Sequence, residues 1–592
     1  MISARALKAL LGEADEYAFL DVREHGQYGE GHPFFCVNLP YSVIEERAPL
    51  LVPRRETLCI LMDDGDGVAE LAHGRLAEMG YTRLVVLEGG APAWAVAGYA
   101  LFKGVNVVSK SFGELVEEAF HTPSVSAEQL LEMQRQGGPL VMLDGRTASE
   151  FQKMSLPGAQ SCPNAELSYR LPELVADENT PVVINCAGRT RSIIGAQSLR
   201  NIGLKNPVYA LRNGTQGWRL AGLELRHGEE AKPQPDLGEK SETLAKQRAA
   251  DLVARFGLNV ISSAELKAMR ADPARTTFVF DVRTETEYRT AHIQGCVHAP
   301  GGQLVQATDE YLATRNARIV LCDDFGLRAA GTAIWLAGMG HEVFVLDADS
   351  RKGPETGEPA SPPSPPFRAA TINEVATAQE ASARIYDASR GMHYRKAHVE
   401  GSRWVTRARL TKEDAGNQPI IVLGRTEQLV AGVIQRLGEL GASNVAGCVG
   451  GADLWEQGGL SVVSTPFEPA EKDCIDFLFF VSFFPQLVAG PIVRASDFIP
   501  QIHQPYSLTR QEFGMALFWI LNGLLKKFLL ADYIAVNFVD RVFDNPFNKD
   551  LSYDFSIDHS PKKQNATAKN KINITGEDAR EGLTAVLSLK VA

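Results

Sequence analysis

The chain has 592 residues and a formal net charge of −12, and 45% of its residues are hydrophobic. Its length predicts about four domains of roughly 150 residues each, with enough apolar side chains for packed cores. The acidic balance excludes nucleic-acid binding as the main activity, because proteins with that activity present basic surfaces to phosphates.

The eight cysteines of the chain are scattered, with no CxxC pair and no Cys/His cluster at metal-ligand spacing. This pattern is typical of a reduced protein rather than of a disulfide framework. The first residues also lack the apolar segment of a secretory signal peptide. We therefore expect a cytoplasmic protein without a bound metal or other cofactor.

An apolar strand that ends in aspartate and a polar turn occurs four times along the chain. Each copy is followed by a second apolar strand, a loop and a helical pattern, and three copies end with glycine and tryptophan. Short strands that alternate with helices predict βαβ units and a parallel sheet, with ligand loops at the carboxyl ends of the strands. The first strands and their turns lie at residues 19–23, 141–146, 280–283 and 386–390, and the second strands at 58–62, 182–185, 318–321 and 419–423.

In the second copy, a cysteine lies where a buried strand ends and a helix begins. The loop from Cys186 to Ser192 contains Arg189 and Arg191. Backbone N–H groups at a helix N-terminus stabilise anions, and nearby arginines favour the thiolate, which is the nucleophilic form of cysteine. The alternative is that Cys186 is a small buried core residue, as many free cysteines are. The two arginines favour the nucleophile.

The repeated pattern resembles the rhodanese family in its Asp-x-Arg strand end, its Gly-containing turn, its cysteine loop and its Gly-Gly-x-x-x-Trp ending. The resemblance implies an α/β fold of four tandem rhodanese-like domains, with parallel sheets flanked by helices. The Asp-x-Arg pairs are expected to be structural rather than catalytic. The predicted ranges are 1–101, 123–230, 258–350 and 369–465 for the four domains and 351–368 for a proline-rich linker.

The resemblance also implies a sulfurtransferase activity in the second domain. The six-residue loop from Cys186 to Arg191 matches the loop of sulfur-transferring members of the family. Cys186 would carry a persulfide, made from a small donor such as thiosulfate and passed to a thiol or cyanide acceptor. The residues expected to hold the anionic donor are Ala187, Gly188, Arg189, Thr190, Arg191 and Ser192.

The other three domains differ at the loop. Equal spacing to the next Met-Gly pair places Met62 and Cys322 at the same position, which we take as the nucleophile position. A thioether cannot form a thiolate, and the fourth domain has no cysteine near Leu423, so the first and fourth domains are expected to be inactive.

The third domain is predicted as a second candidate site, with Cys322 and Arg328 separated by five residues. This longer loop resembles those of related phosphatases and arsenate reductases, although Asp323 and Asp324 should repel an anion. Two alternatives to sulfur transfer therefore stay open. One is oxyanion reduction or phosphatase action at Cys322, and the other is a non-catalytic scaffold for sulfur trafficking.

The C-terminal segment does not continue the repeat and is expected to be an irregular or helical apolar tail. Residues 468–550 resemble a fragment of membrane-bound O-acyltransferases, without the catalytic histidine of that family. Residues 551–592 resemble a segment of the DNA gyrase B subunit, without its ATP-binding motifs. The tail has no apolar run long enough for a standard spanning helix. The two fragments indicate a fused or frameshifted reading frame, and the alternative is a membrane tether.

Overall fold

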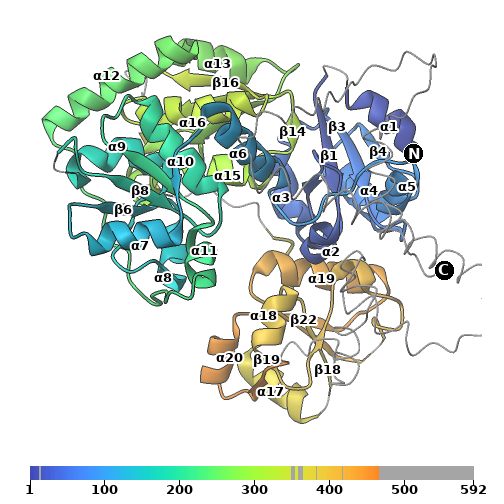
Figure 1. The fold of residues 1–592 in the computed structure, drawn as a ribbon. Helices are drawn as coiled ribbons and strands as arrows, with labels where there is room; N and C mark the ends of the chain where they lie inside the picture. The colour runs from blue at the N-terminus through green and yellow to red at the C-terminus, as the bar shows by residue number, and fades with distance from the viewer. Residues whose placement is uncertain are drawn as a thin grey trace, which may run out of the picture. The chain divides into compact units, whose positions relative to one another are not determined.

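The computed structural model contains several βαβ units, each built on a sheet of parallel strands with helices packed against it (Figure 1). This arrangement confirms the predicted α/β fold of repeated units with parallel sheets flanked by helices. The predicted tail from residue 466 onward and half of the proline-rich linker lie outside the described residues. Among the described residues, no helix is both long and apolar enough to cross a bilayer. The described residues are 1–12, 15–175, 177–348, 354–357, 364–381, 383–416 and 418–465.

The first domain is built on a sheet in the order β14-β1-β3-β4, in which β2 also pairs with β1. Strands β1 and β3 run parallel, with Asp21 opposite Met62. Strand β14 comes from the third domain, Thr314–Arg315, and pairs antiparallel with β1. The other elements are α1 (Ala4–Leu10), β1 (Tyr17–Asp21), α2 (His25–Glu30), β2 (Val37–Asn38), α3 (Ile44–Leu51), β3 (Leu58–Met62), α4 (Val68–Glu78), β4 (Leu84–Val86) and α5 (Gly90–Val96).

The second domain follows helix α6 (Val107–Phe120) and has a sheet in the order β5-β9-β8-β6-β7. All of its strand pairs are parallel, with Asp144 opposite Asn185 at the carboxyl edge of the sheet. Its elements are β5 (Ser124–Val125), α7 (Ala127–Arg135), β6 (Val141–Asp144), α8 (Ala148–Lys153), β7 (Gln160–Ser161), α9 (Asn164–Leu174), β8 (Val182–Asn185), α10 (Thr190–Asn201), β9 (Val208–Leu211) and α11 (Gly214–Leu220).

The third domain follows helix α12 (Glu239–Phe256) and has a sheet in the order β10-β16-β15-β11-β13. Asp281 lies opposite Cys322 in its central parallel pair. Its other elements are β10 (Asn259–Ile261), α13 (Ser263–Ala271), β11 (Thr277–Asp281), α14 (Glu285–Thr290), β12 (His292–Ile293), β13 (Val297–His298), α15 (Gly301–Gln306), β15 (Arg318–Cys322), α16 (Leu327–Gly338), β16 (Glu342–Leu346) and β17 (Pro354–Glu355), which pairs with β12.

The fourth domain has a sheet in the order β20-β18-β21-β22, with Asp387 opposite Leu423. The strands of the four sheets lie within the four predicted ranges, whose boundaries stay predictions. The elements are α17 (Ile372–Glu380), β18 (Arg384–Asp387), α18 (Gly391–Lys396), β19 (His398–Val399), β20 (Arg403–Trp404), β21 (Ile420–Gly424), α19 (Glu427–Glu439), β22 (Val445–Val449), α20 (Ala452–Gln457) and β23 (Val462–Val463).

The Asp-x-Arg pairs of three domains are structural, as predicted. In the first domain, the Arg23 guanidinium donates to the buried Asp21 carboxylate at 2.6 Å and to the carbonyl oxygen of Gly31. Each arginine thereby ties the end of the first strand to the turn that follows the next helix. The same pairs occur at Asp144 and Arg146 and at Asp281 and Arg283.

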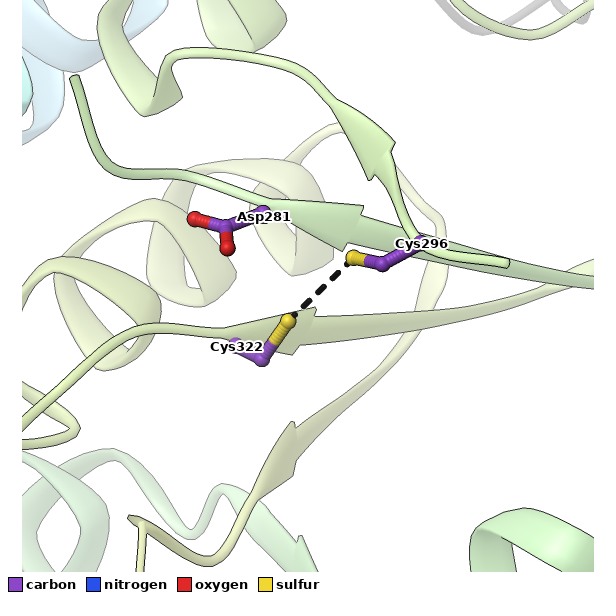
Figure 2. A group of neighbouring side chains, drawn as sticks. All are labelled: Asp281, Cys296 and Cys322. Carbon is purple, nitrogen blue, oxygen red and sulfur yellow. Dashed lines mark hydrogen bonds between the residues drawn. The ribbon is translucent and has the colours of Figure 1, made fainter. Parts of the chain in front are cut away.

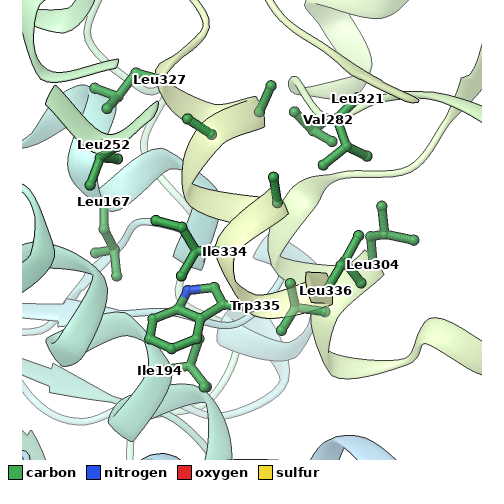
Figure 3. Packing of buried hydrophobic residues seen from close by; sticks show 14 of the residues in the cluster. Leu167, Ile194, Leu252, Val282, Leu304, Leu321, Leu327, Ile334, Trp335 and Leu336 are labelled. Carbon is green, nitrogen blue, oxygen red and sulfur yellow. The ribbon is translucent and has the colours of Figure 1, made fainter. Parts of the chain in front are cut away.

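The second and third domains share one hydrophobic core. Helix α16 of the third domain packs against α9 and α10 of the second, and Trp335 lies beside Ile194 (Figure 3). The indole N–H of Trp335 donates to the Ser198 hydroxyl at 2.9 Å, which satisfies the polar atom of this large side chain. Burial of this shared apolar surface therefore holds the two domains together.

A buried ion cluster lies in the same interface. The side chain of Arg328 is fully buried and donates to Glu166 of the second domain at 3.0 Å and to Glu287 of its own domain at 2.8 Å. Arg170 contacts both of these glutamates, at 2.9 Å each. Charges from two domains therefore neutralise one another away from water, as buried charges must.

We expect the contribution of Glu287 to stability to disappear in acid. Burial opposes ionisation of Glu287, but the charge of Arg328 and hydrogen bonds from Thr284 outweigh it and lower its pKa from 4.5 to about 2. A carboxylate with a lowered pKa stabilises the folded state above its ordinary pKa and loses this effect as the pH falls through the folded value. Glu287→Gln should thus be less stable than the wild type at neutral pH, and the difference should shrink below pH 4.5.

Urea unfolding of both proteins at several pH values measures this difference. Glu285→Gln is the matched control, because Glu285 forms an exposed pair with Arg289 on the same helix. Its stability should track that of the wild type throughout. A difference for Glu287→Gln that is constant with pH would contradict the expected role of this carboxylate.

Candidate active site

Cys186 lies between the end of β8 and the start of α10. The four residues of β8 are buried apolar side chains and an asparagine, and the strand holds the loop at the carboxyl edge of the sheet. The start of α11 fixes the loop from the other side, because Thr215 N–H donates to the Cys186 carbonyl at 2.8 Å. A Cβ atom at Gly214 would lie 2.0 Å from that carbonyl oxygen, so this contact requires glycine.

The thiol of Cys186 is 2% exposed and lies 3.7 Å from the Ser192 hydroxyl. Ser192 donates its own proton to the carbonyl oxygen of Arg189 at 2.7 Å. The hydroxyl lone pairs therefore remain available to accept from the thiol. Ser192 orients the sulfur inside the loop.

The predicted anion-holding arginines both contact carboxylates. Arg191 forms a bidentate pair with Glu150 of α8, with both distances 2.7 Å. Burial opposes ionisation of Glu150, but its hydrogen bonds and charge interaction with Arg191 outweigh it and hold its pKa below the ordinary value. Arg189 contacts Glu114 and Glu117 of α6. An anionic donor would have to compete with these three glutamates, which the sequence analysis missed.

The backbone N–H groups of the loop form an anion-binding site that does not depend on the arginine side chains. In the described part of the chain, the N–H groups of Gly188, Arg189 and Arg191 donate to no protein acceptor. Groups of this kind at a helix N-terminus bind anions through hydrogen bonds and the helix dipole.

The strand register corrects the comparison of the four loops. Each of the four sheets pairs the aspartate that ends its first long strand with one residue of the next long strand. These residues are Met62, Asn185, Cys322 and Leu423. Met62 and Cys322 therefore share the position of Asn185, one residue before Cys186, and the predicted nucleophile position was wrong for both. The residues at the position of Cys186 are Asp63, Asp323 and Gly424 in the first, third and fourth domains.

The third loop is also no longer than the second. Asp323 precedes Arg328 by five residues, as Cys186 precedes Arg191. Arg328 contacts Glu287 at 2.8 Å, as Arg191 contacts Glu150. The prediction of a longer loop in the third domain was therefore wrong. It counted from Cys322, whereas the residue equivalent to Cys186 is Asp323.

In the third domain, an aspartate carboxylate occupies the position equivalent to the anion-binding site of the second loop. Asp323 is 1% exposed, and its two oxygens accept from Gly326 N–H at 2.7 Å and from Arg328 N–H at 3.0 Å. The corresponding groups of the second loop are the open N–H groups of Arg189 and Arg191. Asp63 accepts from three loop N–H groups in the first domain, those of Gly65, Gly67 and Ala69.

Cys322 lies outside this loop. Its side chain belongs to a small buried cluster with Val320 and Leu346, whereas Leu321 faces the core shared with the second domain. Arg328 and Cys322 therefore do not form one site. In the fourth domain, Gly424 places no side chain in the loop and Cys448 lies within β22.

The geometry agrees with the comparisons to known proteins. The Rhodanese-like domain family matches residues 3–97, 126–221 and 262–351. The structure of a thiosulfate sulfurtransferase from Pseudomonas aeruginosa is 39% identical in sequence and aligns with a TM-score of 0.73, covering 78% of this chain and 89% of that chain. The chain therefore belongs to the rhodanese family of sulfurtransferases and contains several rhodanese domains in tandem.

Shorter matches concern other classes of protein. The peptidoglycan O-acetyltransferase of Helicobacter pylori is 38% identical over 93 residues, which are 14% of this chain and 18% of that protein. An HTH-type transcriptional regulator of Mycobacterium tuberculosis is 33% identical over 107 residues, 18% of this chain and 45% of that protein. The chain thus spans less than half of these relatives. The O-acyltransferase resemblance holds for a fragment only, and the gyrase B resemblance of residues 551–592 stays a prediction.

Proposed function

We propose that the chain is a sulfurtransferase that carries sulfane sulfur as a persulfide on Cys186. One observation supports this most directly, namely the carboxylate of Asp323 on the equivalent loop of the third domain. An aspartate side chain and a cysteine persulfide both place a negatively charged atom two bonds beyond Cβ. The second loop has the same number of residues up to its arginine, and the N–H groups of Arg189 and Arg191 donate to no protein acceptor among the described residues. These groups would therefore bind the terminal sulfur of a Cys186 persulfide.

The proposed reaction has two displacement steps. The Cys186 thiolate attacks the outer sulfur of thiosulfate, the sulfur–sulfur bond of the donor breaks, and sulfite leaves with the electron pair. A cyanide or thiol acceptor then attacks the terminal sulfur of the persulfide, and the thiolate of Cys186 leaves. The N–H groups of Arg189 and Arg191 stabilise the negative terminal sulfur between these steps.

The surrounding side chains would assist in distinct ways. Ser192 holds the sulfur of Cys186 inside the loop. Arg191 is fixed by Glu150 beside the loop and supplies positive charge without moving. Arg189 is 42% exposed and can exchange its contacts with α6 for an anionic donor. The described cysteines are all free thiols, which supports our proposal that the protein acts in the cytoplasm.

Mass spectrometry after incubation with thiosulfate tests the carrier directly. We expect the peptide that contains Cys186 to gain the mass of one sulfur atom and to lose it again on addition of cyanide. The peptides that contain Cys322 and Cys162 serve as internal controls and should stay unchanged. Sulfur on another cysteine, or none on Cys186, would contradict the proposal.

A further inference from the structure

A pair of buried thiols in the third domain lies outside the proposed active site. Cys296 follows the turn after β12, and Cys322 is the last residue of β15. Their side chains point toward each other, and the two Sγ atoms are 3.4 Å apart (Figure 2). Cys296 is 1% exposed and Cys322 is 2% exposed, so neither thiol contacts bulk water.

The hydrogen bonds of the third potential ligand argue against a shared metal ion. A tetrahedral metal site would need a further ligand beside the two thiols. Asp281 lies close to both thiols and would be the third metal ligand. Its two oxygens already accept four hydrogen bonds from Arg283.

We propose that Cys296 and Cys322 form a disulfide when the protein meets a small neutral oxidant of the hydrogen peroxide class. One thiolate attacks a peroxide oxygen, the oxygen–oxygen bond breaks, and the sulfur becomes a sulfenic acid with release of water. The second sulfur then attacks the first, the sulfur–oxygen bond breaks, and a second water leaves. Two electrons pass from the two thiols to one peroxide molecule, and no other reactant is needed.

Burial sets the rate of this reaction. It raises the pKa of the Cys296 thiol well above its ordinary value, and the neighbouring Cys322 adds to this effect. Because the thiolate is the reactive form, oxidation should be slow at neutral pH and should accelerate as the pH rises. A small neutral oxidant can enter where larger disulfide reagents cannot, so glutathione disulfide should react far more slowly than peroxide.

The first domain offers an internal control for the pair. Tyr28 donates to the Cys36 carbonyl in the first domain as Tyr288 donates to the Cys296 carbonyl in the third. Met62 occupies the position of Cys322, and Met62 and Cys36 pack in one buried cluster. The first domain therefore has one thiol of the pair and a thioether in place of the other.

The experiment exposes the full-length chain to peroxide, alkylates the remaining thiols in denaturant and maps the peptides by mass spectrometry. We expect a linked peptide that joins Cys296 to Cys322 and has lost the mass of two hydrogen atoms, while Cys36 stays alkylated. Met62→Cys should create a second link, to Cys36. Oxidation in urea, where the pair is no longer held together, should give a mixture of links.

Two results would overturn the proposal. One is complete alkylation of Cys296 and Cys322 after peroxide treatment that oxidises other buried cysteines of the folded chain. The other is a distribution of cysteine links in the folded chain that matches the mixture formed in urea. Because the second comparison uses the wild-type sequence, it does not depend on a variant that folds poorly.

Discussion

Replacing Cys186 with serine should lower kcat/KM for sulfur transfer from thiosulfate to cyanide by at least about a thousandfold, because a serine hydroxyl at neutral pH cannot replace the thiolate nucleophile. The change replaces the sulfur with a smaller oxygen atom and nearly keeps the volume of a residue that is 2% exposed. The fold should therefore be retained, and the loss should appear in kcat. Thiocyanate production measures the rate.

Two further variants make this expectation specific. Cys322→Ser is the matched control and should keep activity within about twofold, because Cys322 belongs to a separate buried cluster. Cys186→Asp should be as inactive as the serine variant and should fold normally, since Asp323 and Asp63 already occupy equivalent positions in this protein. Full activity in Cys186→Ser would contradict the proposed persulfide carrier.

Arg328→Met should lower the free energy of unfolding by about 3–5 kcal/mol, the usual cost when one partner of a buried ion pair is removed. Its guanidinium is fully buried and contacts Glu166 and Glu287. Methionine is similar in length and fills much of the space, so the loss comes mainly from buried carboxylates that keep only Arg170 of their two arginine partners. Urea unfolding, followed by fluorescence of Trp335 in the same interface, measures the change.

Arg47→Met serves as the control for this loss. Arg47 also joins two domains, through Glu310 of the third, but the pair is exposed at 29% and 56% of its side-chain surfaces. Exposed pairs contribute about 0–1 kcal/mol, so this variant should be nearly as stable as the wild type. Equal losses for the two variants would show that burial of Arg328 does not determine its contribution.

Most of the fold could be predicted because its signals are local. Apolar strands such as residues 141–144 end in aspartate and are followed by a polar turn, and this order recurs four times. The Asp-x-Arg pairs span only two residues and close within one turn, so their structural role was also predictable. The candidate nucleophile Cys186 and the two arginines of its loop could also be predicted, because they lie within seven consecutive residues, 186–192.

The loop register could not be predicted, because it depends on strand pairing rather than on spacing. Counting to the next Met-Gly pair aligned Met62 with Cys322 correctly, but it could not align either with the second domain. The pairing of Asp144 with Asn185 shows that Asn185 is the residue of the second domain equivalent to Met62 and Cys322. A shift of one residue in a strand moves a side chain to the other face of the sheet, and this separates Cys322 from the loop.

The acidic partners of the arginines were missed for a similar reason. Glu150 lies 41 residues before Arg191, and Glu117 lies 72 residues before Arg189. A local signal existed for Glu150 alone, since Thr147 and Glu150 form the capping box of α8. The position of α6 near the loop depends on tertiary packing.

The pairing of β14 with β1 has a consequence for how the chain is made. The edge of β1 at Tyr17 and Ala18 stays unpaired until the ribosome has synthesised its partner strand, Thr314–Arg315. Unpaired strand edges invite wrong pairing with other chains, and domains otherwise fold as they emerge during synthesis. We therefore expect this protein to depend most on a chaperone during synthesis, after the first domain has emerged and before β14 can pair with it.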